Sequence, residues 1–259
     1  MKPVKILISL ALVLPLLLLA ACGGKPDPNS LDGQVMTVGK LVVGISADYP
    51  PFESLDNSGK LVGYDVDMAT WLAAHLTTAS GKPYEAEFVQ MSFSTIISAL
   101  QTGQVDVGVA AFSYDPERQC LFTDPYYQSA QVVCVNSASG ITSLADLNGK
   151  TVAAGEGTVG YDAAAQLEGV TVSSPGDYLQ QFELLRAGQI DAVVCDAKVG
   201  QGYADSGSDF VVLEEILAED NLCVTVKEGN TALLAALNKA IAEFISSGTS
   251  DQYKADWGL

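Results

Sequence analysis

Two ionisable side chains of opposite charge follow apolar runs that are typical of buried strands. Arg118 comes shortly after Val109–Phe112, and Asp196 ends Ala192–Cys195. A guanidinium can hold a carboxylate through two parallel hydrogen bonds, and an ionised carboxylate accepts hydrogen bonds from an ammonium group. If the fold brings both residues to one cleft, they could hold the two ends of a small zwitterion.

Each of these residues also has a purely structural interpretation. Arg118 could form a surface ion pair with Asp115 or Glu117, which would stabilise the protein little. Asp196 could cap a helix that begins at Ala197. For Asp196 the structural and the binding interpretation can hold at once.

Further groups could complete such a binding site. Ser113 could donate a hydrogen bond beside Arg118. Residues 155–160 match the pattern G-x-G-x-x-G of dinucleotide sites, but the next strand does not end in the acid that a ribose contact requires. We therefore favour a different interpretation, in which backbone N–H groups near Thr158 and Val159, at the start of a helix, attract an anion.

Two aromatic residues are candidate walls of the cleft. Tyr49 stands in a loop held by Pro50 and Pro51, just after a predicted strand. Phe93 begins a helical pattern and fits the hydrophobic core equally well.

Strand and helix patterns alternate along most of the chain, in two sets. This alternation favours parallel sheets flanked by helices, and the extended stretches 129–136 and 222–227 join the two sets. We therefore predict an α/β fold of two lobes, in which the chain crosses between the lobes twice and the last helices return to the first lobe. The expected strands are 41–45, 84–89, 105–112, 151–154, 170–172 and 190–195, and the expected helices are 66–76, 93–100, 159–167, 178–186, 231–246 and 250–257.

A similar phrase occurs in both sets. Residues 98–108 and 184–193 each run from the end of a helix through a glycine to Gln-Val-Asp or Gln-Ile-Asp, which opens a buried strand. Open α/β sheets bind ligands beyond the carboxyl ends of their strands. Residues 113–118 and Asp196 should therefore face each other across a cleft.

The N-terminal residues have the features of a secretory signal. A positively charged start precedes an apolar stretch that closes with Leu19-Ala-Ala-Cys22, which resembles the lipoprotein box in which the cysteine is lipidated. We expect a signal peptide over 1–21, lipid on Cys22 and a flexible tether rich in Gly, Pro and Asn over 22–37. The protein would then be exported and held at a membrane surface. An ordinary signal with an incidental cysteine is the alternative.

The charge balance excludes nucleic acid as a partner. The chain has 13 basic and 31 acidic side chains, so its net charge of −18 repels phosphate backbones. The single histidine, His75, cannot anchor a multi-histidine metal site, and we expect no cofactor. Four cysteines could pair in three ways, or each could be a small buried apolar residue; they are Cys120, Cys134, Cys195 and Cys223.

Six phrases occur in an order that resembles one known family. They are residues 46–53 (Ser-Ala-Asp-Tyr-Pro-Pro-Phe-Glu), 63–67 (Gly-Tyr-Asp-Val-Asp), 103–106, 113–118, 122–127 and 192–196. From about Leu41 to Trp257 the chain resembles the polar amino-acid solute-binding proteins of ABC transporters, the extracellular solute-binding proteins of family 3. The resemblance implies a type II periplasmic-binding-protein fold, in which two lobes, each a mostly parallel sheet flanked by helices, close over a free amino acid.

The resemblance also implies roles for the residues at matching positions. The α-carboxylate would be bound by Arg118, Ser113 and the backbone at Val159. The α-ammonium would be bound by Asp196 and by the backbone near Ala110 or Ala111, and the side chain would be enclosed by Tyr49 and Phe93. A monomer, anchored through Cys22, would deliver its ligand to a membrane permease. The expected lobes are 38–131 with 225–259, and 132–224.

Departures from the family pattern bear on the ligand. Ala110 and Ala111 occupy positions where many relatives have serine or glycine, and Val159 replaces a frequent threonine. Ser46 lies where several relatives that bind cationic or amide side chains carry aspartate. A basic amino acid is therefore not favoured by position 46, although Glu53, Asp115 or Glu156 could supply the charge. The sequence leaves the bound amino acid open.

Two other functions compete with capture of an amino acid. The same fold hosts lyases that act on carboxylated rings, such as cyclohexadienyl dehydratase, but we expect no histidine in the cleft to act as acid or base. A sensory module would report amino acids to a membrane kinase, but we see no membrane-spanning segment after the domain. We expect a binding protein and no enzyme.

Overall fold

The structure is a computed structural model that describes residues 25–207 and 209–259. The signal peptide predicted over 1–21 and the lipidation predicted at Cys22 lie outside the described residues. Within the described part of the chain, no helix is long and apolar enough to cross a membrane.

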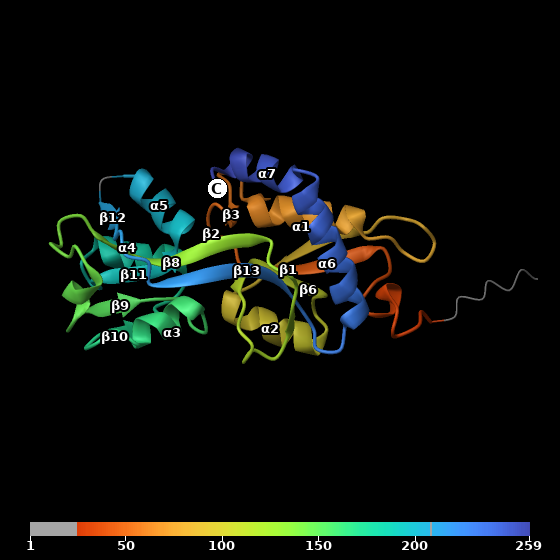
Figure 1. Cartoon of the computed structure of the whole chain (residues 1–259), viewed down its shortest axis with the longest axis horizontal. Helices are drawn as coiled ribbons and strands as arrows, with labels where there is room; N and C mark the ends of the chain where they lie inside the picture. The colour runs from red at the N-terminus through yellow and green to blue at the C-terminus, as the bar shows by residue number, and fades with distance from the viewer. Residues whose placement is uncertain (1–24, 208) are drawn as a thin grey trace, which may run out of the picture.

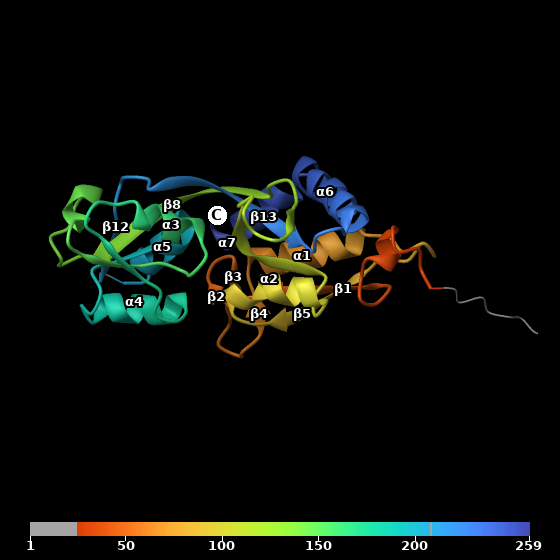
Figure 2. The ribbon, with the colours of Figure 1, turned by 90° about the horizontal axis from the view of Figure 1, so that it is seen from below.

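Two lobes share one continuous mixed sheet (Figures 1 and 2). The ten-stranded sheet has the order β10-β9-β11-β8-β13-β6-β1-β5, with β12 paired to β8 and β7 paired to β13. The parallel sheets predicted for the two lobes are therefore present, and they are joined in the middle by antiparallel strands.

Lobe 1 is built from the first and the last parts of the described chain. Its strands alternate with helices as the sequence pattern predicts, and a small three-stranded sheet covers one edge of the cleft. Its strands are β1 (Lys40–Ile45), β2 (Asp48–Tyr49), β3 (Glu53–Leu55), β4 (Leu61–Val62), β5 (Glu85–Gln90), β6 (Val107–Ser113) and β7 (Leu121–Phe122). Its helices are η1 (Leu31–Gly33), α1 (Tyr64–His75), α2 (Phe93–Thr102), α6 (Thr231–Ser246) and α7 (Thr249–Trp257).

Lobe 2 is built from the middle of the chain and repeats the alternation. Its strands β9 and β11 are parallel neighbours, like β1 and β6 in lobe 1. Its elements are η2 (Leu144–Leu147), β9 (Thr151–Ala153), α3 (Val159–Ala165), β10 (Thr171–Ser173), α4 (Tyr178–Arg186), β11 (Ala192–Asp196), α5 (Ala197–Asp205) and β12 (Phe210–Val212).

Two long strands form the crossing between the lobes (Figure 1). They are β8 (Tyr127–Asn136) and β13 (Ala218–Val226), which pair antiparallel from Ala218 opposite Gln131 to Leu222 opposite Tyr127. From Leu222 onward β13 pairs with β6 of lobe 1. The second crossing therefore lies before residue 225, where we expected lobe 1 to resume.

Buried strands and helix stripes form the cores of both lobes. In lobe 1 the face of α1 that carries Met68 and Leu72 packs on β1 and β6, and α6 adds Leu237 and Phe244. Burying apolar side chains in this way is the main favourable contribution to folding. A second cluster, around Val152 and its neighbours, fills lobe 2.

The described part of the segment predicted as a tether makes contacts with lobe 1. Ser30 caps η1, and the side-chain oxygen of Gln34 accepts the N–H groups of Ala232 and Leu233 at 2.8 and 3.0 Å. These are orphan donors in the first turn of α6, so Gln34 acts as their cap. The composition of this segment could not indicate these contacts, because the residues of α6 that make them lie about 200 positions further along the chain.

All four cysteines of the described residues are buried free thiols. The sulfur atoms of Cys134 on β8 and Cys195 on β11 lie 3.8 Å apart.

Candidate ligand-binding cleft

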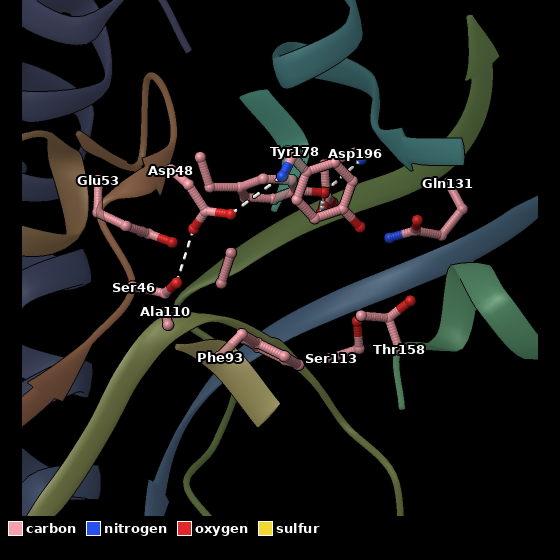
Figure 3. Close-up of a pocket in the computed structure, with 12 residues that line it drawn as sticks. Ser46, Asp48, Glu53, Phe93, Ala110, Ser113, Gln131, Thr158, Tyr178 and Asp196 are labelled. Carbon is pink, nitrogen blue, oxygen red and sulfur yellow. Dashed lines mark hydrogen bonds between the residues drawn. The ribbon is translucent and has the colours of Figure 1, made fainter. Parts of the chain in front are cut away.

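A cavity lies between the lobes, at the ends of the strands (Figure 3). Twelve residues from both lobes line it: Ser46, Asp48, Tyr49, Glu53, Phe93, Ala110, Ala111, Ser113, Gln131, Thr158, Tyr178 and Asp196. Seven of these were predicted from the sequence. The cavity opens into a groove of about 750 Å³ that shares Ser46, Asp48, Phe93 and Tyr178.

The lobes touch across this cavity through side chains of β2. The Tyr49 hydroxyl donates to Oδ2 of Asp196 at 2.8 Å and accepts from the Asp196 backbone N–H at 2.7 Å. Asp48 accepts the backbone N–H of Tyr178, the first residue of α4, at 3.2 Å. The cavity is consequently only about 30 Å³, which is room for water and not for an amino acid. The lobes must shift for a larger ligand to enter.

Arg118 is not among the residues that line the cavity, but it contacts Phe93, which is, and its guanidinium lies against two aromatic rings. Its guanidinium carbon is 5.5 Å from the Phe93 ring centroid and 5.3 Å from that of Phe112. It pairs with Asp115 at 3.4 Å, as the surface interpretation expected, and its Nη2 donates to the carbonyl of Gly157 in lobe 2. The side chain is nevertheless only 11% exposed, and Nη1 is buried without a partner among the described residues. Burial lowers the pKa of this guanidinium.

Asp196 ends β11 and is 2% exposed. It occupies the N-cap position of α5, but its side chain makes no capping hydrogen bond and faces the cavity instead. Burial, followed by the charge of Asp220, raises the pKa of Asp196 to about 7. Its Oδ1 has no partner among the described residues, so the carboxyl group can accept a further donor.

Glu53 brings a second buried acid to the cavity, from β3 in lobe 1. It is 1% exposed, and Figure 3 shows its side chain pointing into the cavity toward Ser46 and Asp48. Burial and the neighbouring charge of Asp65 raise the pKa of Glu53 well above its usual value. The sequence named Glu53 only as one possible source of charge.

Ser113 and Thr158 line the cavity, but their hydroxyl groups already have partners. The Ser113 hydroxyl donates to Asp220 at 2.6 Å, where Gln131 also donates at 2.8 Å. Thr158 caps α3 by accepting the N–H of Tyr161, and it donates to Gly155 at 2.8 Å. Val159, the first residue of α3, is not among the residues that line the cavity.

Two small residues of β6 form the floor of the cavity. Ala111 has a φ of 45°, which is rare for a residue with a side chain, and its N–H donates to Asp65 at 2.9 Å. Backbone strain of this kind persists only where the surroundings enforce it, and it often occurs at binding sites. Ala110 is buried beside it, and Phe93 stacks on Phe112 at 4.6 Å.

Of the other five lining residues, Ser46 and Glu53 were considered only for their bearing on the charge of the ligand, and three were not considered at all: Asp48, Gln131 and Tyr178. Asp48 accepts the Ser46 hydroxyl at 2.7 Å, and the ring of Tyr178 lies 4.6 Å from that of Tyr49. The position of Asp48 just before Tyr49 in the loop after β1 could have indicated it. Gln131 and Tyr178 reach the cavity through tertiary packing, for which the sequence offers no local signal.

The described residues contain no group of three or more His, Cys, Asp or Glu side chains that could hold a metal ion. His75 lies on α1, where it stacks on Trp71 and is exposed to solvent. It is not among the residues of the cavity.

Comparison with known proteins identifies the family. Residues 41–259 match bacterial extracellular solute-binding proteins, family 3. The chain belongs to this family. It is 30% identical to the arginine-binding extracellular protein ArtP of Bacillus subtilis (strain 168), over 92% of both chains.

Solved structures of this family share the fold. An ancestral arginine-binding protein bound to arginine superposes with a TM-score of 0.78 at 34% identity, covering 85% of this chain and 98% of that one. The ancestral amino acid-binding protein AncCDT-1, a precursor of cyclohexadienyl dehydratase, gives 0.76 at 31% identity, with coverage of 85% and 95%. The predicted two-lobed periplasmic-binding-protein fold is thereby confirmed.

Proposed function

We propose that this protein captures a free amino acid with a cationic side chain, L-arginine first among the candidates, and delivers it to an ABC permease outside the cytoplasm. One observation supports this most: three buried polar atoms in or next to the cavity have no hydrogen-bond partner among the described residues. They are Nη1 of Arg118, Oδ1 of Asp196 and Oε2 of Glu53. One cationic donor and two acids complement a carboxylate, an ammonium group and a second cation.

The charges around the cavity favour a cationic ligand side chain. Asp48 and Glu53 line its lobe 1 side, and no lysine, arginine or histidine is among its lining residues. Position 46 carries serine where several relatives have aspartate, but Asp48 supplies a negative charge beside it: its carboxylate accepts a hydrogen bond from the Ser46 hydroxyl. Relatives whose names state arginine binding agree with this direction.

Binding would couple the ligand to movement of the lobes. Arg118 and Glu53 belong to lobe 1, whereas Asp196 belongs to lobe 2. A ligand held by all three stabilises the closed arrangement by contacts that an open arrangement cannot make. Its ammonium group would also replace the Tyr49 hydroxyl as a donor to Asp196.

A thermal-shift screen of the mature protein against the common amino acids tests this function. A ligand present at 100 times its Kd should stabilise the fold by about 2.7 kcal/mol, which is roughly 5–10 °C in Tm for a protein of this size. We expect the largest shift with L-arginine or L-lysine. If no amino acid shifts Tm, amino-acid capture is wrong; if only neutral ones do, the cationic side chain is wrong.

Anchoring at the membrane is a separate part of the proposal. Lipid on Cys22 would keep a monomeric protein beside its permease. Replacing Cys22 by Ala in the full chain should release the protein from the membrane fraction, and retention would contradict the anchor. Monomer size should be checked on the released protein by light scattering.

A lyase is the second candidate, because the AncCDT-1 structure is similar and because Asp196 has a raised pKa of about 7. A buried acid with such a pKa is suited to proton transfer. Incubation with prephenate, followed by product analysis, distinguishes the two. Turnover of prephenate without a thermal shift by any amino acid would favour the enzyme.

A further inference from the structure

We propose that Glu53 and Asp65 share one proton in the ligand-free protein, and that a cationic ligand side chain replaces this proton and is bound by the ionised Glu53. The inference rests on the proposed function, because it requires a cationic ligand. It adds a specific residue and a measurable proton to the binding reaction.

The backbone forces the two acids together. Gly63, just before α1, has a φ of 138°, and a Cβ placed there would lie 2.0 Å from the carbonyl oxygen of Phe52. This close approach lets the N–H of Asp65 donate to the same carbonyl at 2.9 Å. Asp65, in the first turn of α1, is thereby fixed beside Glu53, the residue that follows Phe52.

A proton between the acids explains their unpaired oxygens. Oδ2 of Asp65 accepts the N–H of Ala111 at 2.9 Å and the hydroxyl of Tyr126 at 2.8 Å. Oδ1 of Asp65 and Oε2 of Glu53 are buried and receive no donor among the described residues. Two neighbouring buried carboxyl groups without a donor can satisfy each other only if one of them carries a proton, because an ionised carboxylate is an acceptor only.

The surroundings place the proton on Glu53. The ionisable groups that face it are Asp48 and Tyr49 from β2, Asp65 from α1, Asp196 from β11, and Tyr126. None of these is a cation, and like charges in a buried site cannot all ionise. Burial raises the pKa of Glu53 well above its usual value, whereas Asp65, with two donors, is raised only to about 6.

A cation in the cavity changes this balance. Its positive charge favours the ionised form of Glu53, so the carboxylic acid loses its proton to the solvent and the carboxylate accepts hydrogen bonds from the ligand. A neutral ligand side chain offers no such charge, and the acid keeps its proton. Binding of a cationic amino acid should therefore release the proton of Glu53 in addition to any protons that other groups of the cleft release. The affinity for such a ligand should rise with pH.

Isothermal titration calorimetry of the mature protein with L-arginine, in buffers of different ionisation enthalpy near neutral pH, measures this release. The same titrations use Glu53→Gln, whose amide N–H can donate to Asp65 as the protonated acid does. We expect the wild type to release about one proton more than Glu53→Gln, which should bind L-arginine at least 10-fold more weakly at about pH 8. The matched control Glu87→Gln replaces an acid that is 51% exposed and pairs with Lys40; it should behave like the wild type.

Each outcome decides a different statement. Equal proton release by the wild type and Glu53→Gln overturns the inference and leaves arginine capture standing. Binding of neutral amino acids alone also overturns it, whereas no binding of any amino acid overturns the proposed function itself. If Glu53→Gln fails to fold, the wild type decides alone: arginine affinity that does not change between about pH 6 and about pH 8 contradicts the exchange.

Discussion

The two lobes share a framework and differ where their strands meet the cleft. In both, a helix, a glycine and a Gln-x-Asp phrase lead into a buried strand, and the aspartate accepts a backbone N–H of the neighbouring strand. Beyond that, lobe 1 places the acids Glu53 and Asp48 at the cavity and Arg118 against Phe93 next to it, whereas lobe 2 places Asp196 at the cavity. The repeated phrase therefore serves folding, and binding depends on what each lobe adds at the strand ends.

The largest expected effect comes from removing the cation of lobe 1. Arg118→Ala deletes two hydrogen bonds to a ligand carboxylate, each worth roughly 1.5–3 kcal/mol for a charged group. We expect affinity for the ligand to fall at least 100-fold and the thermal shift by ligand to vanish, with the protein still folded by circular dichroism.

The chain offers a matched control for this variant. Arg186 lies on α4 in lobe 2, where it pairs with Glu183 and Asp209 at the surface. Arg186→Ala should keep the thermal shift. If Arg118→Ala keeps it too, Arg118 is a structural ion-pair residue and the division of tasks between the lobes is wrong.

Removing the acid of lobe 2 should have the next largest effect. Asp196→Asn keeps the size of the side chain and removes the charge that would meet the α-ammonium group. We expect binding about 10- to 100-fold weaker, measured by calorimetry, since one charge-assisted interaction is lost. Unchanged affinity would show that lobe 2 contributes only backbone to the ligand.

The pH dependence of stability separates the acids of the cleft from ordinary surface acids. Burial raises the pKa of Asp196 to about 7 and that of Asp65 to about 6, so the folded state binds more protons than the unfolded state between about pH 4 and pH 7. Their stabilising effect is present at low pH and is lost as the pH rises through these values. We expect Tm of the ligand-free protein to be several degrees higher at about pH 5.5 than at about pH 8. Asp196→Asn should reduce this difference, and a Tm that rises with pH would contradict it.

The comparison of lobes also shows what the sequence can predict. Alternating apolar patterns predicted the main strands and helices, and the end of α4 at Arg186 agrees to the residue. Arg118 and Asp196 were predicted as site residues because each comes at or soon after the end of an apolar strand, and of the two Asp196 lines the cavity. These sequence patterns are local, because each depends only on how the side chains of a single strand or helix are divided between its buried and exposed faces.

Long-range pairing explains what the sequence left open. The bond between Tyr49 and Asp196 joins residues 147 positions apart, and the contact of Gln34 with α6 spans almost 200. The continuous sheet depends on β8 pairing with β13, which no local pattern predicts. The proton that we propose between Glu53 and Asp65 requires that no cation of the described residues faces them, which only the packed structure shows.

The smallest effect concerns the framework itself and compares Asp106 with Asp191, the equivalent acids of the repeated phrase. Asp106 is 3% exposed and accepts the N–H groups of Met36 and Val42 at 2.7 and 2.8 Å. Asp191 has a side chain that is 37% exposed, accepts the N–H of Thr151 at 2.8 Å and pairs with Lys150 at 3.4 Å.

Replacing each acid by Asn should therefore cost different amounts of stability. Asp106→Asn turns an amide NH₂ toward one of the two N–H groups, of which that of Val42 is buried and that of Met36 partly buried, and we expect the free energy of unfolding to fall by about 1–3 kcal/mol. Asp191→Asn should cost less than about 1 kcal/mol, because water can replace the lost bond and exposed ion pairs are weak.

Urea unfolding of both variants measures the difference. Ligand affinity should stay at the wild-type value in both, since neither acid lines the cavity. Equal losses of stability in the two variants would mean that the deeper burial of Asp106 does not make it more important for folding than Asp191. The lobes would then differ only at the strand ends.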